Sequence, residues 1–338
     1  AASQEDRYDN GIVLGLHWGR FLGEWQALAS RRQYEDAIAR IRRYIAAGDT
    51  YQVNYTIRLK STAEGSPYAL FHALVAAQQA SHCAFVSTDT HAICSASPEL
   101  FFRLEGDRIV SRPMKGTAPR GLTAEEDEAN AGALRASGKN QAENIMIVDM
   151  IRNDLGRVAE PDTVRVTSTF DVERYPTVLQ MTSTVEARTG ASFVDIIRAM
   201  FPCASVTGAP KVRTMEIIQE LEPESRGIYT GAIGYLAPER RAGFNVAIRT
   251  VAIDKRTGTA EYGVGGGVVW DSVGAQEYEE CLTKARVLTL RDPEFELIET
   301  LLWTPVEGYF LMEKHLARIR KSARYFGFRF TPSQAKKR

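Results

Sequence analysis

The fold class is indicated by residues 228–264, IYTGAIGYLAPERRAGFNVAIRTVAIDKRTGTAEYGV. The β-forming residues of this stretch fall into three runs, 228–237, 242–254 and 259–264. Turn residues separate the runs, with Pro238-Glu239 after the first and Thr257-Gly258 after the second. This pattern predicts a meander of antiparallel strands.

In the rest of the chain, the expected strands and helices also fall into groups. Further strands are expected at 50–59, 82–88, 91–97, 99–105, 107–112, 163–170 and 177–187. Helical periodicity predicts helices at 34–47, after Pro67, and at 124–136, 140–155, 192–200, 210–221 and 274–290. Because grouped strands do not alternate strictly with helices, the expected class is α+β.

Composition limits the classes of partner. The 338 residues include 42 Lys plus Arg and 42 Asp plus Glu, so no basic field exists to hold nucleic acid or an anionic membrane. No apolar run approaches the roughly 20 residues of a membrane span. The four cysteines form no Cys-x-x-Cys pair, which argues against zinc and fits a reducing cytoplasm. We therefore expect a cytoplasmic protein with neither a nucleic acid nor a membrane as partner.

Histidine is absent from most of the chain. The five histidines leave the whole region from 92 to 314 without one. If a site lies there, lysine, glutamate or water must perform its acid–base chemistry.

A lysine stands in the segment SRPMKGTAPRG, residues 111–121, which reads as a loop. Lys115 lies between Pro113 and the pair Gly116-Thr117. A loop lysine is ordinarily a solvated charge. The alternative is a reactive amine, and the surrounding sequence must decide between them.

Carboxylates recur at helical spacing in two places. Glu143 begins an apolar helical stripe, where an acid is also favoured by the helix dipole alone. Glu277, Glu280 and Lys284 share one face of the last expected helix. That face is either a solvated salt-bridge surface or a pair of carboxylates directed at Mg²⁺, which prefers oxygen ligands.

Two glycine-containing stretches could expose backbone to a ligand. Thr207 and Gly208 precede a helix whose free N–H groups would suit an anion. The triplet 265–267 is all glycine, which permits close approach of a ligand or, on the plain interpretation, a bulge. Together with Arg249, these features indicate a carboxylate ligand whose chemistry is run by lysine and glutamate.

At these residues the chain resembles the chorismate-utilising family, which includes anthranilate, aminodeoxychorismate, isochorismate and salicylate synthases. Nine motifs carry the resemblance between residues 33 and 291: GDTYQVNYTIRL, SASPELF, RPMKGTAPRG, AENIMIVDMIRNDLGR, FPCASVTGAPKVRTMEII, GAIGYL, FNVAIRT, YGVGGGVVWDS and EYEECLTKAR. The resemblance implies a sandwich of two large antiparallel sheets with helices outside and chorismate between the sheets.

Two positions separate the branches of this family. Anthranilate synthases carry alanine at the position of Lys115, whereas isochorismate and salicylate synthases carry lysine at the position of Gln52. The pair Gln52 and Lys115 resembles the aminodeoxychorismate synthase branch, which replaces the C4 hydroxyl of chorismate with an amino group on the way to 4-aminobenzoate and folate. That branch takes ammonia from a glutamine amidotransferase subunit. The alternatives are an anthranilate synthase component I and a non-catalytic chorismate-binding fragment.

The resemblance also implies roles for single residues. Lys115 would be the nucleophile, with its pKa lowered by burial, Arg112, Arg120 and Mg²⁺, and Glu99 would be an acid–base residue. Glu143 and Glu280 would ligate Mg²⁺, supported by Glu277. Substrate would be held by the remaining candidates, which are Gly116, Thr117, Thr207, Gly208, Tyr235, Arg249, Gly265, Gly266 and Lys284.

The chain departs from the family pattern at Gln180, where many members have histidine, and at Asn140, where an acid is common. The expected division is an irregular segment at 1–32 in place of the family's N-terminal segment, a catalytic domain at 33–291 and a further unit at 292–338. Residues 295–338 resemble the opening of a class IV pyridoxal-phosphate enzyme such as aminodeoxychorismate lyase, ending before a cofactor lysine. The alternative is a private C-terminal extension.

Overall fold

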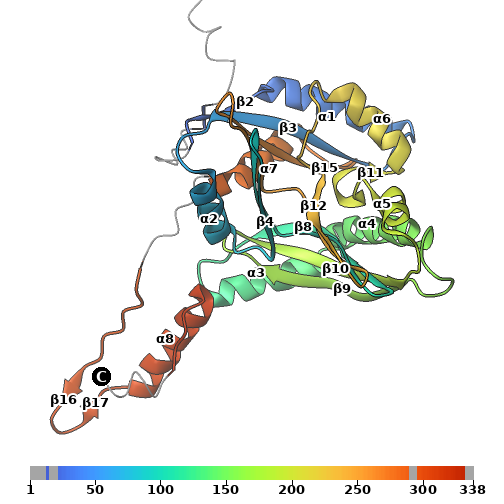
Figure 1. Ribbon diagram of the computed structural model, residues 1–338. Helices are drawn as coiled ribbons and strands as arrows, with labels where there is room; N and C mark the ends of the chain where they lie inside the picture. The colour runs from blue at the N-terminus through green and yellow to red at the C-terminus, as the bar shows by residue number, and fades with distance from the viewer. Residues whose placement is uncertain (1–12, 15–21, 289–294, 332–338) are drawn as a thin grey trace, which may run out of the picture.

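Two antiparallel β-sheets face each other in the computed structural model, which describes residues 13–14, 22–288 and 295–331 (Figure 1). The first sheet runs β1 (Val13–Leu14), β2 (Trp25–Ala27), β3 (Gln52–Thr62), β15 (Thr259–Val268), β14 (Thr250–Asp254), β5 (His91–Ser97) and β4 (His82–Ser87), and β11 (Gly208–Ala209) also pairs with β3. The second sheet runs β12 (Ala232–Ala237), β13 (Arg241–Val246), β6 (Leu100–Glu105), β7 (Arg108–Arg112), β10 (Val178–Arg188) and β8 (Met114–Pro119), and β9 (Arg165–Arg174) pairs with β10. The α+β class and the two-sheet sandwich are thereby confirmed.

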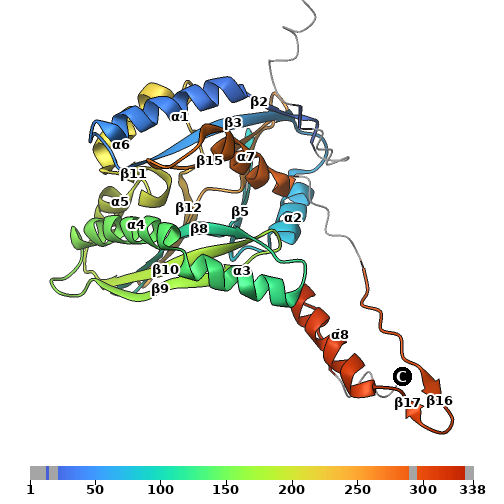
Figure 2. The same cartoon turned by 180° about the vertical axis from the view of Figure 1, so that it is seen from behind.

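Seven helices accompany the two sheets within the described part of the chain, and an eighth follows the second gap. They are α1 (Arg31–Ala46), α2 (Pro67–Gln78), α3 (Ala124–Ala136), α4 (Gly138–Gly156), α5 (Phe193–Met200), α6 (Lys211–Leu221), α7 (Gly274–Ala285) and α8 (Met312–Phe326). Helices α1 and α6 lie side by side along the first sheet in both views (Figures 1 and 2). Helix α4 packs on β8 and β10, and α7 packs on β15.

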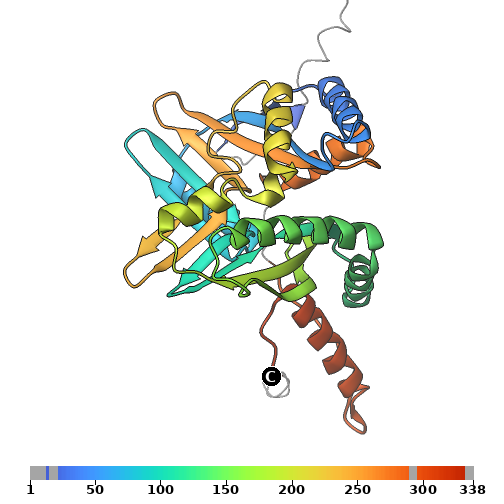
Figure 3. The same ribbon diagram turned by 90° about the vertical axis from the view of Figure 1, so that its right-hand side faces the viewer.

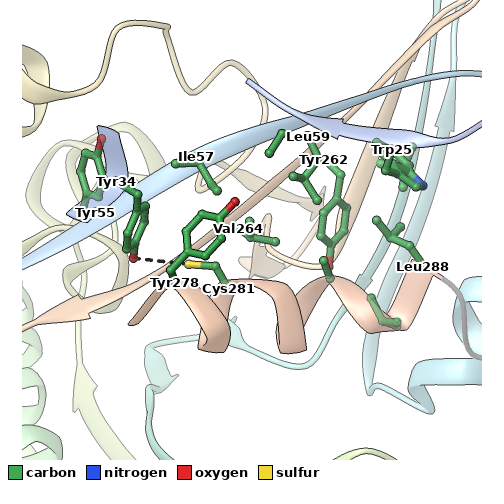
Figure 4. Close-up of a cluster of buried hydrophobic side chains, with 14 of the residues drawn as sticks. Trp25, Tyr34, Tyr55, Ile57, Leu59, Tyr262, Val264, Tyr278, Cys281 and Leu288 are labelled. Atoms are coloured by element: carbon green, nitrogen blue, oxygen red, sulfur yellow. Dashed lines mark hydrogen bonds between the residues drawn. The ribbon is translucent and has the colours of Figure 1, made fainter. Parts of the chain in front are cut away.

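The core of the first sheet is rich in aromatic rings (Figure 4). Helix α1 begins at a capping box, because the side chain of Ser30 accepts from the Gln33 amide while the Gln33 side chain accepts from Ser30 N. The helix then buries Tyr34, whose ring centroid lies 5.4 Å from that of Tyr278 on α7. The thiol of Cys281 donates to the Tyr34 hydroxyl at 3.4 Å. These contacts fix α1 and α7 to each other over β3 and β15.

The meander expected at 228–264 is wrong in one respect: its middle run is two strands in different sheets. Strand β13 ends at Val246 in the second sheet, and β14 begins at Thr250 in the first. Arg249 between them has a φ of 51°, a left-handed conformation that breaks a strand. The chain therefore crosses between the sheets at residues 247–249.

A second crossing lies beside the first. Strand β5 of the first sheet ends at Ser97 and β6 of the second begins at Leu100. The Val246 amide donates to the Glu99 carbonyl at 3.1 Å, and the Ala96 amide donates to the Arg249 carbonyl at 3.0 Å. Each crossing thus satisfies backbone groups of the other.

Two further expectations need correction. Residues 111–121, expected to be a loop, contain strand β8, in which Thr117 pairs with Gln180 of β10. The segment 1–32, expected to be irregular, includes strand β2, because the ring of Trp25 is fully buried and lies 6.1 Å from that of Tyr262. Most of that segment lies outside the described residues, as do 289–294.

The tail of the chain projects from the sandwich beside α3 (Figure 3). It forms the hairpin β16 (Trp303–Thr304) and β17 (Gly308–Tyr309), followed by α8. The guanidinium of Arg120 lies 5.2 Å from the centre of the Tyr325 ring, and the Tyr325 hydroxyl donates to the Gly121 carbonyl. The tail thus contains two short strands and a helix, and α8 contacts the segment that follows β8.

We expect Gly208→Ala to reduce the free energy of unfolding by about 3 kcal/mol, because Gly208 has a φ of 146° and an added Cβ would lie 2.0 Å from the Gln52 carbonyl oxygen. Gly132→Ala is the matched control, since a Cβ there meets nothing within 4 Å. In mid-helix this control should gain about 0.5–1 kcal/mol. Urea unfolding measures both, and equal stabilities of the two variants would contradict the close approach of β11 to β3.

Candidate active site

A cavity of about 360 Å³ lies between the two sheets, within the size range of small-molecule sites. Both crossings reach it, and so do β8, β15, α4 and α7. Most of the sequence-predicted site residues line it: Glu99, Lys115, Gly116, Thr117, Glu143, Arg249, Gly265, Gly266, Glu277, Glu280 and Lys284. Residues separated by up to 185 positions in the sequence (99 and 284) therefore share one cavity.

Lys115 extends from β8 over the backbone of β15. A Cβ placed on Gly267 would lie 2.6 Å from the Lys115 Nζ, so the amine in its present position lies directly against bare backbone. Burial lowers the pKa of Lys115, Glu143 opposes that shift and Lys284 adds to it. A lowered pKa leaves a larger fraction of the amine unprotonated and nucleophilic.

The two arginines expected to lower the Lys115 pKa are paired elsewhere. Arg112 Nη2 lies 2.9 Å from Glu173 Oε1, and Arg120 Nε lies 2.6 Å from Asp127 Oδ1. Neither lines the cavity. Burial, as expected, is the main cause that lowers the pKa of Lys115, and Lys284 is the cation that adds to it.

Glu99 stands at the second crossing, between β5 and β6, and is almost completely buried. Its carboxylate accepts from the Met114 amide at 3.4 Å, next to Lys115 in the chain. Burial raises the pKa of Glu99 to about 7, although Ser205 and Lys115 act in the opposite direction. Such a group is half protonated near neutral pH and can donate or accept a proton.

Carboxylates gather at the α7 wall of the cavity. A Cβ on Gly266 would lie 3.3 Å from Glu277 Oε2 and 3.7 Å from Glu280 Oε1. Burial and the neighbouring Glu280 raise the pKa of Glu277, whereas Lys284, 2.6 Å from Glu280 Oε1, lowers the pKa of Glu280. Lys284 Nζ also donates to the Gly265 carbonyl at 2.8 Å.

Arg249 enters the cavity from the first crossing, between β13 and β14. Its guanidinium donates to the Lys284 carbonyl, which ties the crossing to α7. Tyr229 and Tyr262 line the same cavity. The Tyr229 ring rests on β15, where a Cβ on Gly263 would lie 2.2 Å from it.

Three residues predicted to contact substrate do not line the cavity. Tyr235 is 60% exposed on β12 and does not line the cavity. Thr207 and Gly208 lie behind the lining, where the Thr207 hydroxyl donates to the Cys203 carbonyl and Gly208 pairs with Val53. Residues 207–208 therefore build the wall of the cavity rather than its surface.

Sequence reasoning missed Tyr229, a tyrosine that lines the cavity. It also missed Asn54, Lys139, Ser205, Val206 and Tyr262 as lining residues. The family resemblance pointed to Tyr235, and no local signal in the run 228–237 marks Tyr229 as a cavity residue.

The two family departures lie at the same cavity. Gln180 Nε2 donates to the Thr117 hydroxyl at 3.0 Å, and Asn140 packs beside Gly116. Gln52 is fully buried, and neither of its amide atoms has a hydrogen-bond partner in the described part of the chain. Its Nε2, like the Lys115 Nζ, lies close above Gly267.

Comparison with known proteins agrees with this geometry. The sequence matches the chorismate binding enzyme family over residues 4–290. Aminodeoxychorismate synthase component 1 of Klebsiella aerogenes is 44% identical over 262 residues, which cover 77% of this chain and 58% of the relative. Anthranilate synthase component 1 of Thermus thermophilus is 42% identical over 266 residues, 78% of this chain and 57% of the relative. The chain thus spans less than two thirds of the length of these relatives.

Solved structures show the same fold. Anthranilate synthase component I from Streptococcus pneumoniae superimposes with a TM-score of 0.73 at 30% identity, covering 86% of this chain and 63% of that one. The menaquinone-specific isochorismate synthase of Escherichia coli gives a TM-score of 0.72 at 22% identity, covering 82% of this chain and 66% of that one. With its two-sheet sandwich and the cavity between the sheets, this chain belongs to the chorismate binding enzyme family.

Proposed function

We propose that this protein is the chorismate-aminating component of an aminodeoxychorismate synthase. The observation that carries the proposal is the buried amine of Lys115 in a cavity shared with Glu99 and Arg249. The relatives from Klebsiella aerogenes and Bacillus subtilis, 44% and 41% identical, bear that name. The product would be 4-amino-4-deoxychorismate, a precursor of 4-aminobenzoate and folate.

In the proposed reaction, Lys115 Nζ forms a bond to ring carbon C2 of chorismate, both ring double bonds shift by one position, and the C4 hydroxyl leaves. Glu99, with its pKa near 7, supplies the proton with which the hydroxyl leaves as water. Ammonia then attacks C4, both double bonds shift back, and the lysine amine is released from C2. The protein thus divides one substitution into two displacements.

Binding of the substrate follows from the distribution of charge. Arg249 and the backbone of Gly265 and Gly266 would hold the enolpyruvyl carboxylate, while Gly116 and Thr117 would meet the ring carboxylate. Lys284 neutralises Glu280 and sits between the α7 carboxylates and β15. Positioning of both carboxylates would place C2 against Lys115.

The donor set of the cavity fits Mg²⁺. In the described part of the chain no group of three His, Cys, Asp or Glu side chains is close enough to hold a metal by itself. Glu143 and Glu280 would each supply an oxygen, with Glu277 beside them, and substrate and water would complete a Mg²⁺ shell. When bound, the ion would offset the repulsion between these carboxylates and the ring carboxylate.

The proposed nitrogen source is ammonia delivered by a glutamine amidotransferase subunit, as the words component 1 in the relatives' names suggest a partner. No helix within the described residues is long and apolar enough to cross a membrane. We place the protein in the cytoplasm, because its cysteines are free and most are buried.

We assign residues 295–338 to the opening of a lyase-like unit of the class IV pyridoxal-phosphate type. The assignment rests on the sequence resemblance and on the order of the elements, in which the hairpin of β16 and β17 is followed by helix α8. The contacts of α8 with the segment after β8 would join this unit to the catalytic domain.

Anthranilate formation is the second candidate, because an anthranilate synthase component 1 is 42% identical to this chain. The two activities differ in the carbon that ammonia attacks and in the loss of pyruvate. The lysine at position 115 favours amination at C4, since a covalent adduct at C2 blocks that carbon from ammonia.

We expect chorismate, Mg²⁺ and ammonium salt to give an aminated product with the mass of aminodeoxychorismate. Lys115→Arg should reduce turnover at least about a thousandfold, because arginine keeps the charge but is no useful nucleophile. With ammonia withheld, intact-mass analysis should find an adduct on Lys115. Lys255→Arg, an exposed lysine on the β14–β15 hairpin, is the control. Anthranilate as the main product, or wild-type turnover by Lys115→Arg, would refute the assignment.

We expect Glu280→Gln to weaken Mg²⁺ binding by about 10- to 100-fold, because one charged oxygen ligand is lost. Calorimetric titration of Mg²⁺ in the presence of chorismate measures the affinity directly, and turnover should fall with it. Glu279→Gln on the same helix is the matched control, since the Glu279 side chain is 60% exposed and pairs with Arg31. Full turnover in excess chelator would contradict the metal assignment.

We expect the stability contributed by Glu99 to depend on pH. Its pKa rises from an ordinary 4.5 to about 7 on folding, so the folded state binds the proton more tightly between these values. The free energy of unfolding should therefore fall by about 3 kcal/mol from pH 4.5 to pH 7, relative to Glu99→Gln. Urea unfolding at several pH values measures the difference, with Glu279→Gln as the control. A difference that stays constant with pH would show that Glu99 titrates normally.

A further inference from the structure

A cluster of three charged side chains is buried behind the cavity wall. Arg58 from β3 and Glu222 have side chains that are 6% and 5% exposed, and that of Arg226 is 15% exposed. Glu222 and Arg226 lie between α6 and β12 in the chain, just before Tyr229. We call these three residues the buried charge cluster.

Arg226 bonds to two residues of the cavity wall. It donates to the Val206 carbonyl at 2.7 Å and to the Asn54 carbonyl at 2.6 Å, and both residues line the cavity. Two more bonds, at 2.7 and 2.9 Å, join it to the two carboxylate oxygens of Glu222. Arg226 therefore fixes Glu222 relative to the wall.

Glu222 in turn holds β3. Its carboxylate accepts from the backbone amide of Thr56 at 2.9 Å and from the Thr56 hydroxyl at 2.8 Å, and it lies 3.7 Å from Arg58 Nη2. Arg58 also donates to the Thr56 hydroxyl at 3.0 Å. The guanidinium of Arg58 thus contacts both the Glu222 carboxylate and the Thr56 hydroxyl.

Arg58 contacts the substrate cavity through one aromatic ring. Its guanidinium carbon lies 5.0 Å from the centroid of the Tyr229 ring, within cation–π range. The same ring rests on Gly263, the cross-strand partner of Arg58, where any Cβ would collide with it. Tyr229 therefore packs against both a cation and bare backbone at the cavity surface.

The buried charge cluster is not explained by a contribution to the free energy of unfolding. It buries two cations with one carboxylate, and its Arg58 Nε has no hydrogen-bond partner in the described part of the chain. Buried ion pairs seldom stabilise a protein more than apolar residues of the same volume would. A net charge of plus one behind the Tyr229 wall would, however, favour an anion in the cavity.

We propose that Arg58 is a positioning residue for a dicarboxylate substrate, held by Glu222 and Arg226 so that it fixes the Tyr229 ring in the cavity wall and places positive charge behind it. The proposal rests on the proposed function for the identity of the ligand, chorismate. Arg58 does not line the cavity, so its effect must pass through Tyr229 and the electrostatic field.

A double-mutant cycle on chorismate affinity tests the proposal. We expect Arg58→Gln to raise the Kd and KM for chorismate about tenfold while kcat changes less than about twofold, because a desolvated cation–π contact and a buried charge are lost. In a Tyr229→Leu background, Arg58→Gln should change the Kd by much less than tenfold. Arg58→Lys, which keeps the charge, should restore part of the affinity.

Calorimetric titration of chorismate gives the Kd, and thermal unfolding reports the fold of each variant. Arg256→Gln, at an arginine whose side chain is 67% exposed, is the control and should leave the Kd unchanged. An unchanged Kd in Arg58→Gln, or equal effects with and without the Tyr229 ring, would overturn the proposal. Wild-type protein that binds chorismate without aminating it would refute the proposed function, whereas the binding test of Arg58 would remain valid. Failure of the wild type to bind chorismate would overturn both.

Discussion

The two chain crossings between the sheets are the constraint on which the rest of the structure depends. They run beside each other and share backbone hydrogen bonds, with the Val246 amide on the Glu99 carbonyl and the Ala96 amide on the Arg249 carbonyl. The Ser97 hydroxyl adds a bond of 2.6 Å to the Val246 carbonyl. Because buried backbone groups must find partners, neither crossing could hold its path without the other. The same two crossings carry Glu99 and Arg249 to the cavity, so the fold and the chemistry share one origin.

Charge in the cavity is balanced rather than uniform. Lys284 is paired with Glu280, whereas the Lys115 amine is set against Glu99 and Glu143 in a region that penalises charge. Burial pushes the pKa of Lys115 down and that of Glu99 up, which brings both groups closer to neutral pH. An acid and an amine that start from opposite ends of the pH scale are thereby made compatible with one reaction. The missing histidine is not needed.

Local sequence predicted the elements well and their assembly less well. The helix at 124–136 coincides with α3, because its N-cap Thr123 and its three acids in the first turn are local signals. The run 242–254 shows where local signals end. Its β-forming residues continue on both sides of position 249, and nothing in the pattern marks the left-handed Arg249 at which the chain changes sheets. The α7 spacing did bring Glu277, Glu280 and Lys284 together, whereas only the folded cavity shows that Tyr229 lines it and Tyr235 does not.

The glycines of β15 give the cavity a floor made of backbone. A Cβ at Gly265 would lie 2.4 Å from the Tyr55 carbonyl oxygen, and one at Gly267 would lie 2.6 Å from the Lys115 amine. A side chain at Gly265 would collide with backbone, and one at Gly267 would displace the Lys115 amine, so this surface has little room for side chains. Diversification must come from neighbouring strands, at positions such as 52 and 115 that overhang the glycines. The β15 backbone can stay the same while the side chains at positions such as 52 and 115 change. This is a physical reason why the same fold occurs in synthases with different names.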